Sequence, residues 1–167
     1  MRITVNLSVD SINNAINQLN TYKQRLNERV NILLDIMAQE GETFALLHLN
    51  DFNFDNNPEH SETTVMSYRE GNKGIIVAGG NAMWVEFGTG VLHNTTKHPK
   101  ADELGMSPWG TYGKGKGASL TGWWYWDDAR NMPIHTEGIT ANMFMYNTAK
   151  YLRERLPRLA QEIFSND

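Results

Sequence analysis

The chain has 167 residues, of which 40% are hydrophobic, a formal net charge of -4 and no cysteine. Its length fits one domain over residues 1–167, its hydrophobic content excludes a largely disordered chain, and its lack of cysteine excludes disulfides and thiolate metal sites. The mild acidity disfavours tight binding to a nucleic-acid backbone, and no segment approaches the roughly 20 consecutive apolar residues that a membrane span requires.

The first part of the chain carries two different periodicities. Apolar and polar side chains alternate over residues 2–9, which predicts a strand with one buried face. Apolar residues then recur every three or four positions over residues 11–48, which predicts a helix that Asp10 or Ser11 caps. Asparagines crowd its start and are poor helix formers, so we expect a short first helix and a longer second one from about Tyr22. A coiled coil is the alternative.

Turn and strand signals follow in the middle of the chain. Residues 50–62 are rich in Asn and Asp and predict a loop, whereas residues 63–78 predict a hairpin around a turn at residues 70–74. Residues 82–87 are too few to distinguish a helix from a strand. Residues 91–121 have no periodicity, and we expect a long flexible loop there, since structureless connections longer than roughly 15 residues usually carry function or are disordered.

The last part of the chain combines an aromatic strand with a closing helix. Residues 122–127 include aromatic side chains at successive positions, which predicts a strand buried on both faces or shared with a neighbouring chain. A final helix is expected from about Ala141. Pro157 should kink this helix near Arg153, whose carbonyl loses its hydrogen-bond donor.

One carboxylate, Glu86, lies among large apolar side chains in the sequence Ala-Met-Trp-Val-Glu-Phe-Gly-Thr-Gly over residues 82–90. Ionised carboxylates are almost never fully buried without a partner, because leaving water unpaired costs several kcal/mol. Glu86 therefore faces solvent, meets a donor across a subunit boundary, or does chemistry.

Sites for catalysis or nucleotide binding have weak support in the sequence. A zinc site would need three or four ligands, which this chain could draw from Glu86, His93, His98 and His135. Their spacing is irregular, and we favour histidines on surface loops. Residues 110–117 resemble a phosphate-binding loop but end in glycine where magnesium needs a Ser or Thr, and no helix is predicted after them.

Four of the five tryptophans lie after residue 100, namely Trp109, Trp123, Trp124 and Trp126. Large aromatic side chains are typical of protein cores and of the desolvated centres of interfaces. Exposed indoles can instead form a stacking platform for sugars or bases. The sequence leaves the three roles open, and we favour a core or an interface.

Two segments carry a resemblance to a known family. They are Val-Glu-Phe-Gly-Thr at residues 85–89 and the start of the last helix, with Gly138, Ile139, Ala141 and Phe144. With the order strand, helix, hairpin, long loop, aromatic strand and closing helix, the chain resembles the small neck proteins of long-tailed bacteriophages, known as head-tail joining, tail-completion or minor tail proteins. The resemblance implies an α+β fold in which a small antiparallel sheet packs against a long N-terminal helix and a C-terminal helix, with a long central loop.

The resemblance also implies a structural protein without cofactor or catalytic activity. Family members assemble as rings, commonly six-fold, on the axis between the DNA-filled head and the tail tube. We therefore expect a virion protein of the head-tail junction that is assembled in the cytoplasm of the bacterial host, with a hexamer implied by the family. A metal-dependent hydrolase and a tryptophan-based carbohydrate-binding module are the alternatives.

The expected partners are copies of the chain itself, neighbouring neck or connector proteins, and the tail terminator or tail tube protein. DNA would pass through the ring without specific binding. A ring needs two different complementary surfaces on each subunit, and the closing helix or the long loop would form the second one. We expect the first surface to contain Trp84, Glu86, Phe87, Thr89, Trp123, Trp124, Tyr125 and Trp126. A loop that docks on a neighbouring ring is expected to use His93, Lys97, Trp109, Tyr112, Lys114 and Lys116.

Overall fold

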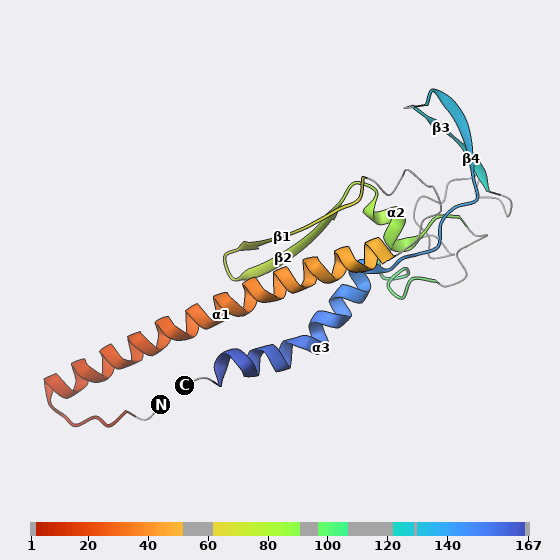
Figure 1. The fold of residues 1–167 in the computed structure, drawn as a ribbon. Coiled ribbons are helices and arrows are strands. Elements are labelled where there is room, and N and C mark those ends of the chain that lie inside the picture. The colour runs from red at the N-terminus through yellow and green to blue at the C-terminus, as the bar shows by residue number, and fades with distance from the viewer. Residues whose placement is uncertain (1–2, 52–61, 91–96, 107–121, 129, 166–167) are drawn as a thin grey trace.

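The computed structural model describes residues 3–51, 62–90, 97–106, 122–128 and 130–165. These residues form an elongated molecule with one long helix along much of its length (Figure 1). In chain order the elements are α1 (Val9–Asp51), β1 (Thr64–Glu70), β2 (Lys73–Gly79), α2 (Ala82–Phe87), β3 (Trp123–Asp127), β4 (Met132–Thr136) and α3 (Phe144–Phe164). The predicted α+β class, with long N-terminal and C-terminal helices and small antiparallel sheets, is confirmed.

Helix α1 is continuous for 43 residues, so the predicted break near Tyr22 is wrong. The asparagines near its start are exposed, where each costs at most about 0.7 kcal/mol relative to alanine, and neither proline nor glycine precedes Gly41 within the helix. The strand predicted over residues 2–9 is also wrong for the described residues 3–8. The predicted cap, Asp10 or Ser11, is wrong as well, because both residues lie inside α1, and the Ser8 hydroxyl caps the helix by accepting a hydrogen bond from the Ser11 backbone N–H at 3.2 Å.

The second half of α1 carries the β1–β2 hairpin on one side and α3 on the other (Figure 1). The Glu42 carboxylate accepts hydrogen bonds from the backbone N–H and the hydroxyl of Ser67, at 2.8 and 2.6 Å, and so ties α1 to β1. Gly41 lies where Ile76 and Leu152 both approach, since a Cβ there would stand 2.3 Å from Ile76 Cδ1. The glycine therefore lets the hairpin and α3 pack close to α1 at the same point.

Helix α3 begins at Phe144, three residues later than predicted, and Figure 1 shows it bent, as Pro157 inside the helix predicts. Arg155 links α3 to α1 by donating to Glu40, with Nε 3.2 Å from Oε2. Hydrogen bonds from Arg155 and Arg158 lower the pKa of Glu162. These groups reach solvent, so the network contributes little stability and serves mainly to align the two helices.

The two antiparallel hairpins have different surroundings. The predicted hairpin is confirmed as β1–β2, in register from Thr64↔Gly79 to Glu70↔Lys73, and it packs on α1. Strand β3 pairs with β4, which the sequence analysis did not predict, and this hairpin stands at the end of the molecule opposite the start of α1 (Figure 1). Burial alternates along β3, so the described residues do not bury both of its faces, and the alternative that a neighbouring chain shares this strand stays a prediction.

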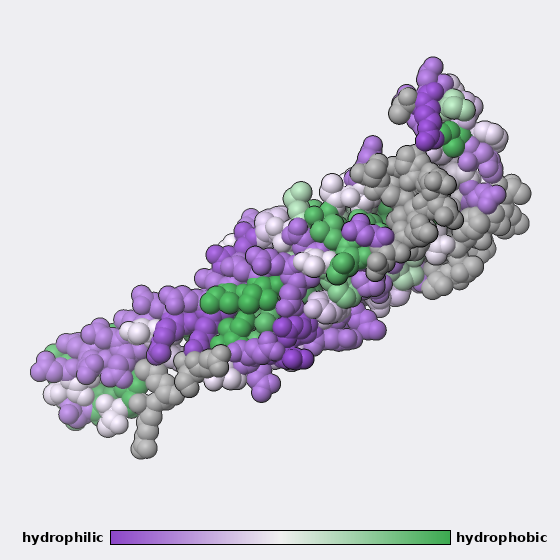
Figure 2. Space-filling model, in the orientation of Figure 1, coloured by the Kyte–Doolittle hydropathy of each residue, from purple (hydrophilic) through white to green (hydrophobic). Residues whose placement is uncertain are grey.

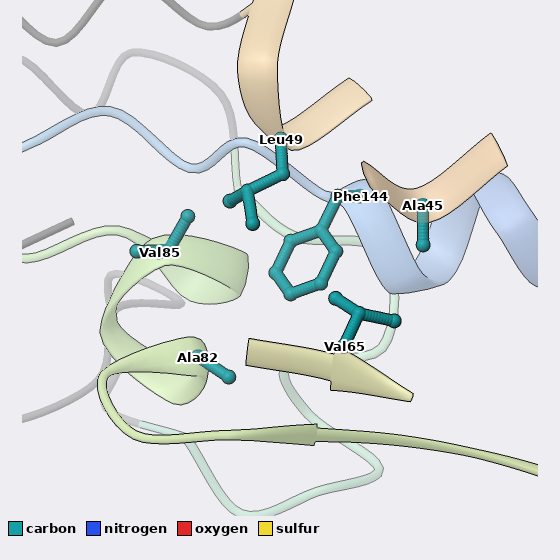
Figure 3. Close-up of a cluster of buried hydrophobic side chains, with 6 residues drawn as sticks. All are labelled: Ala45, Leu49, Val65, Ala82, Val85 and Phe144. Atoms are coloured by element: carbon teal, nitrogen blue, oxygen red, sulfur yellow. The ribbon is translucent and has the colours of Figure 1, made fainter. Parts of the chain in front are cut away.

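The core forms where α1, β1, α2 and the start of α3 meet. Phe144 is completely buried, and its ring lies at the centre of the cluster (Figure 3). The buried members are Ala45, Leu49, Val65, Ala82, Val85 and Phe144. This cluster places the end of α2 directly against the start of α3.

We expect Phe144→Ala to lower the free energy of unfolding by about 3–5 kcal/mol, because it removes the ring and leaves a cavity in the core. Urea unfolding followed by circular dichroism measures the change. Leu47→Ala is a matched control on α1, since that side chain is 57% exposed and its loss should cost about 0.5 kcal/mol or less. Equal losses in the two variants would contradict this placement of the core.

Candidate functional site: the Glu86 junction and the aromatic hairpin

The two segments that carry the family resemblance pack against each other. The Thr89 backbone N–H donates to the Ile139 carbonyl at 2.9 Å, and the Ile139 N–H donates back to the Thr89 carbonyl at 3.1 Å. Gly138 has a φ of 89°, and a Cβ at this position would stand 2.1 Å from the Thr89 carbonyl oxygen. Only glycine fits so close an approach, which explains why the segment carries one here.

Glu86 is buried at this junction and caps the start of α3 from outside the helix. Its Oε2 accepts from the Met145 N–H at 2.8 Å, and its Oε1 accepts from the Tyr146 N–H and from His98 Nε2, each at 2.9 Å. The residue at the cap position, Met143, has a left-handed φ of 59° and provides no side-chain hydrogen bond. The Glu86 carboxylate therefore satisfies backbone donors that the helix leaves unpaired.

The hydrogen bonds of His98 define its tautomer. Its Nδ1 accepts from the Lys100 backbone N–H at 3.1 Å, so the ring proton resides on Nε2 and is donated to Glu86. The imidazole is buried, with the Phe87 ring centroid 4.2 Å away and the Tyr146 ring 5.4 Å away. A neutral His98 and an ionised Glu86 satisfy this network, and the positive end of the α3 dipole stabilises the negative charge.

The ligand set considered for a zinc site is not assembled in the described residues. Within that part of the chain, no three His, Asp or Glu side chains form a group that could hold a metal ion. Glu86 and His98 instead bind each other, and His135 lies on β4 with its ring 5.1 Å from that of Trp124. His93 lies outside the described residues.

A cleft of about 720 Å³ opens beside the Glu86–His98 pair. It lies between α2, residues 97–106 and the first turns of α3, with an apolar lining that includes Met83 and Met145. Lys150 and Arg153, one turn apart on α3, are exposed at this cleft. Neither side chain forms a hydrogen bond or ion pair with the described residues. The cleft thus combines an apolar lining with two cations available to a ligand.

The β3–β4 hairpin presents indoles to solvent. Trp124 and Trp126 are 67% and 57% exposed on one face. Trp123 and Tyr125 are partly buried on the opposite face. Trp123 approaches Gly90, where a Cβ would stand 2.8 Å from its ring. The hairpin is therefore attached to the Glu86 junction by one face and leaves the other face open.

The residues that the sequence analysis assigned to a subunit interface fall into two groups. Glu86, Phe87 and Thr89 are buried against the chain's own segments, where they hold the junction together. The others are at least partly accessible: Trp84, Trp123, Trp124, Tyr125 and Trp126. Burial thus leaves the tryptophans, rather than the carboxylate, available for contacts with another chain.

Most of the residues assigned to a docking loop, namely His93, Trp109, Tyr112, Lys114 and Lys116, lie outside the described residues. Lys97 is described, and its ammonium pairs with the Asp102 carboxylate. The expectation that His98 lies on a surface loop is wrong, because it is buried with Glu86. The sequence analysis also missed Lys150 and Arg153, which stand in a helix whose polar face has no distinguishing pattern.

No family model, curated protein or solved structure matches this chain. Among the described helices, none has the length and apolar character needed to cross a membrane.

We expect Glu86→Gln to lower the free energy of unfolding by about 1–3 kcal/mol, because the amide group turns a donor toward N–H groups that need an acceptor. The amides of Met145 and Tyr146 should also exchange with deuterium faster. Glu103→Gln is the matched control, since that carboxylate is exposed and pairs only with Lys100 in the described structure. Unchanged exchange at the start of α3 would contradict the capping role.

Proposed function

We propose that this chain is a structural virion protein that forms a ring at the head-tail junction of a long-tailed phage. The resemblance to phage neck proteins rests on residues 85–89 and on the segment that opens the last helix. In the fold these two segments meet, and Glu86 joins them. Their contact supports the proposal because residues that are far apart in the chain serve a single junction.

The observation that carries the proposal is the pair of unlike surfaces on one subunit. A closed ring needs a heterologous contact, in which one surface of each subunit fits a different surface of the next. The exposed indoles of Trp124 and Trp126 form a projecting surface, and the cleft beside α3 forms a recessed one. The projecting surface is aromatic, and the recessed one combines an apolar lining with two cations, which supports a contact between them.

The proposed contact places the β3–β4 hairpin of one subunit in the cleft of the next. Met83 and Met145 provide an apolar lining on which indoles lose their contact with water. Arg153 and Lys150 can stand over the indole faces, and such cation–π contacts contribute roughly 0.5–2 kcal/mol each. Trp and Arg are also the residues that most often dominate the binding energy of interfaces.

Within the virion the ring would surround the path of DNA. The net charge of -4 disfavours adhesion to phosphates, so DNA can move through without specific binding. Neighbouring neck or connector proteins would bind one side of the ring, and the tail terminator or tail tube protein the other. The proposed role is structural, and a hexamer is the copy number implied by the resemblance.

We expect Trp124→Ala to abolish rings that the wild-type chain forms at high concentration, as seen by native mass spectrometry and negative-stain electron microscopy. Arg153→Ala should weaken ring formation as well, and the double variant should be little worse than Trp124→Ala alone, because the two side chains act in one contact.

Tyr68→Ala is the control for Trp124→Ala, since Tyr68 is an exposed aromatic residue on the other hairpin. It should leave rings intact. Rings that persist in Trp124→Ala would overturn the hairpin-in-cleft contact, and a bound metabolite in that cleft would overturn the structural role.

A further inference from the structure

We propose that the first half of α1 pairs with the same segment of a second copy of this chain. The contact would use an apolar stripe that the subunit leaves exposed, formed by Ile12, Ile16, Leu19, Tyr22 and Leu26. These residues recur every three or four positions, as in the seam of a coiled coil. Their exposure ranges from 38% for Tyr22 to 54% for Leu19.

The stripe continues the face of α1 that already packs on α3. Leu26 lies about four helical turns before Glu40 and five before Phe44. Glu40 binds Arg155 of α3, and Phe44 stacks on Tyr151 of α3 with ring centroids 4.2 Å apart. The same face therefore forms a helix–helix contact in the second half of α1 and has no such contact in the first half.

Helix α3 ends before it can cover the stripe. Its last residue, Phe164, accepts a hydrogen bond from Arg29 Nη1 at 3.3 Å. Residues 9–28 extend beyond that point by roughly 30 Å, at 1.5 Å per residue. Figure 2 shows apolar groups on the surface along α1, both near its middle and toward its free end. The exposed stripe is thus the continuation of a buried seam.

The free half of α1 lacks the packing that normally stabilises a helix. Its residues are exposed, apart from Ser11 and Ala15. Five of them are asparagines, which are weak helix formers, and most of the stability of a helix in a protein comes from tertiary packing of its apolar face. A partner on the stripe would supply that packing, and the anchored second half of α1 already holds the helix in position for it.

The side chains beside the stripe favour a second copy over a charged partner. In coiled coils these flanking positions select partners by charge. Here the flanking residues, Ser11 and Gln18 on one side and Asn20 and Asn27 on the other, are uncharged, so they bring no like charges together when two copies approach. Lys23 lies within the stripe, between the directions of Ile16 and Leu19, and its long side chain can extend its ammonium group to water. This self-pairing does not require a virion role and uses the end of the subunit opposite the β3–β4 hairpin.

Disulfide trapping tests the pairing cleanly, because the natural chain has no cysteine. A parallel pair in register and an antiparallel pair centred on Leu19 both bring the two Leu19 side chains together. We expect oxidised Leu19→Cys to form linked dimers at least about tenfold faster than Gln24→Cys, which lies exposed on the opposite side of the helix. Equal rates for the two variants would overturn the pairing.

A second variant tests the apolar contact in solution. Leu19→Glu should weaken self-association in sedimentation experiments by about tenfold or more, the factor that corresponds to exposing one leucine. Its circular dichroism at low concentration should match that of the natural chain, because Leu19 is exposed within the subunit. Association equal to that of the natural chain, or a natural chain that stays monomeric at every concentration, would overturn the proposal.

The two proposals fail separately. Trp124→Ala in a Leu19→Cys background should block the hairpin contact and leave the disulfide-linked dimer intact. Loss of the Leu19→Cys dimer in that background would contradict an independent contact through α1.

Discussion

The fold depends on one buried charge at a helix terminus. Glu86 leaves water only because three N–H donors surround it, two from the first turn of α3 and one from His98. The free N–H groups of α3 are in turn satisfied by a carboxylate that comes from α2. Each group would be costly to bury alone, so the interaction fixes α2, residues 97–106 and α3 in one arrangement. The glycines around Thr89 and Ile139 then allow the backbones to meet.

The chain has a buried core that stabilises the fold and exposed surfaces near its two ends. Phe144, Val85 and the Glu86–His98 pair are enclosed near the crossing of α1 and α3. At one end of the subunit Trp124 and Trp126 face solvent, and at the other end the free half of α1 does so (Figure 1). An elongated shape with a small core cannot cover these surfaces itself, and exposed apolar patches of this kind are typical of interaction sites.

The two proposed contacts lie at opposite ends of the molecule and would serve different purposes. The hairpin and the cleft are unlike surfaces and can close a ring, whereas the stripe on α1 is matched to a copy of itself. Separation of the two contacts along the subunit would let one form without the other. The Glu86 junction supports the first contact, because it holds the cleft beside α3 and the segment around Ile139 that leads to the hairpin in a fixed relation.

The sequence by itself determined the elements whose signals are local. The period of α1, the turn between β1 and β2, the aromatic strand and the bend at Pro157 all follow from spacing and backbone chemistry within a few residues. Local signals also indicated that Glu86 needs a partner if it leaves water. Tertiary structure alone decided that the partner is the start of α3 with His98 and that residues 3–8 form no strand. The partners of Glu86 lie 12 and 60 positions away, and a strand needs another strand to pair with, and no local pattern contains either piece of information.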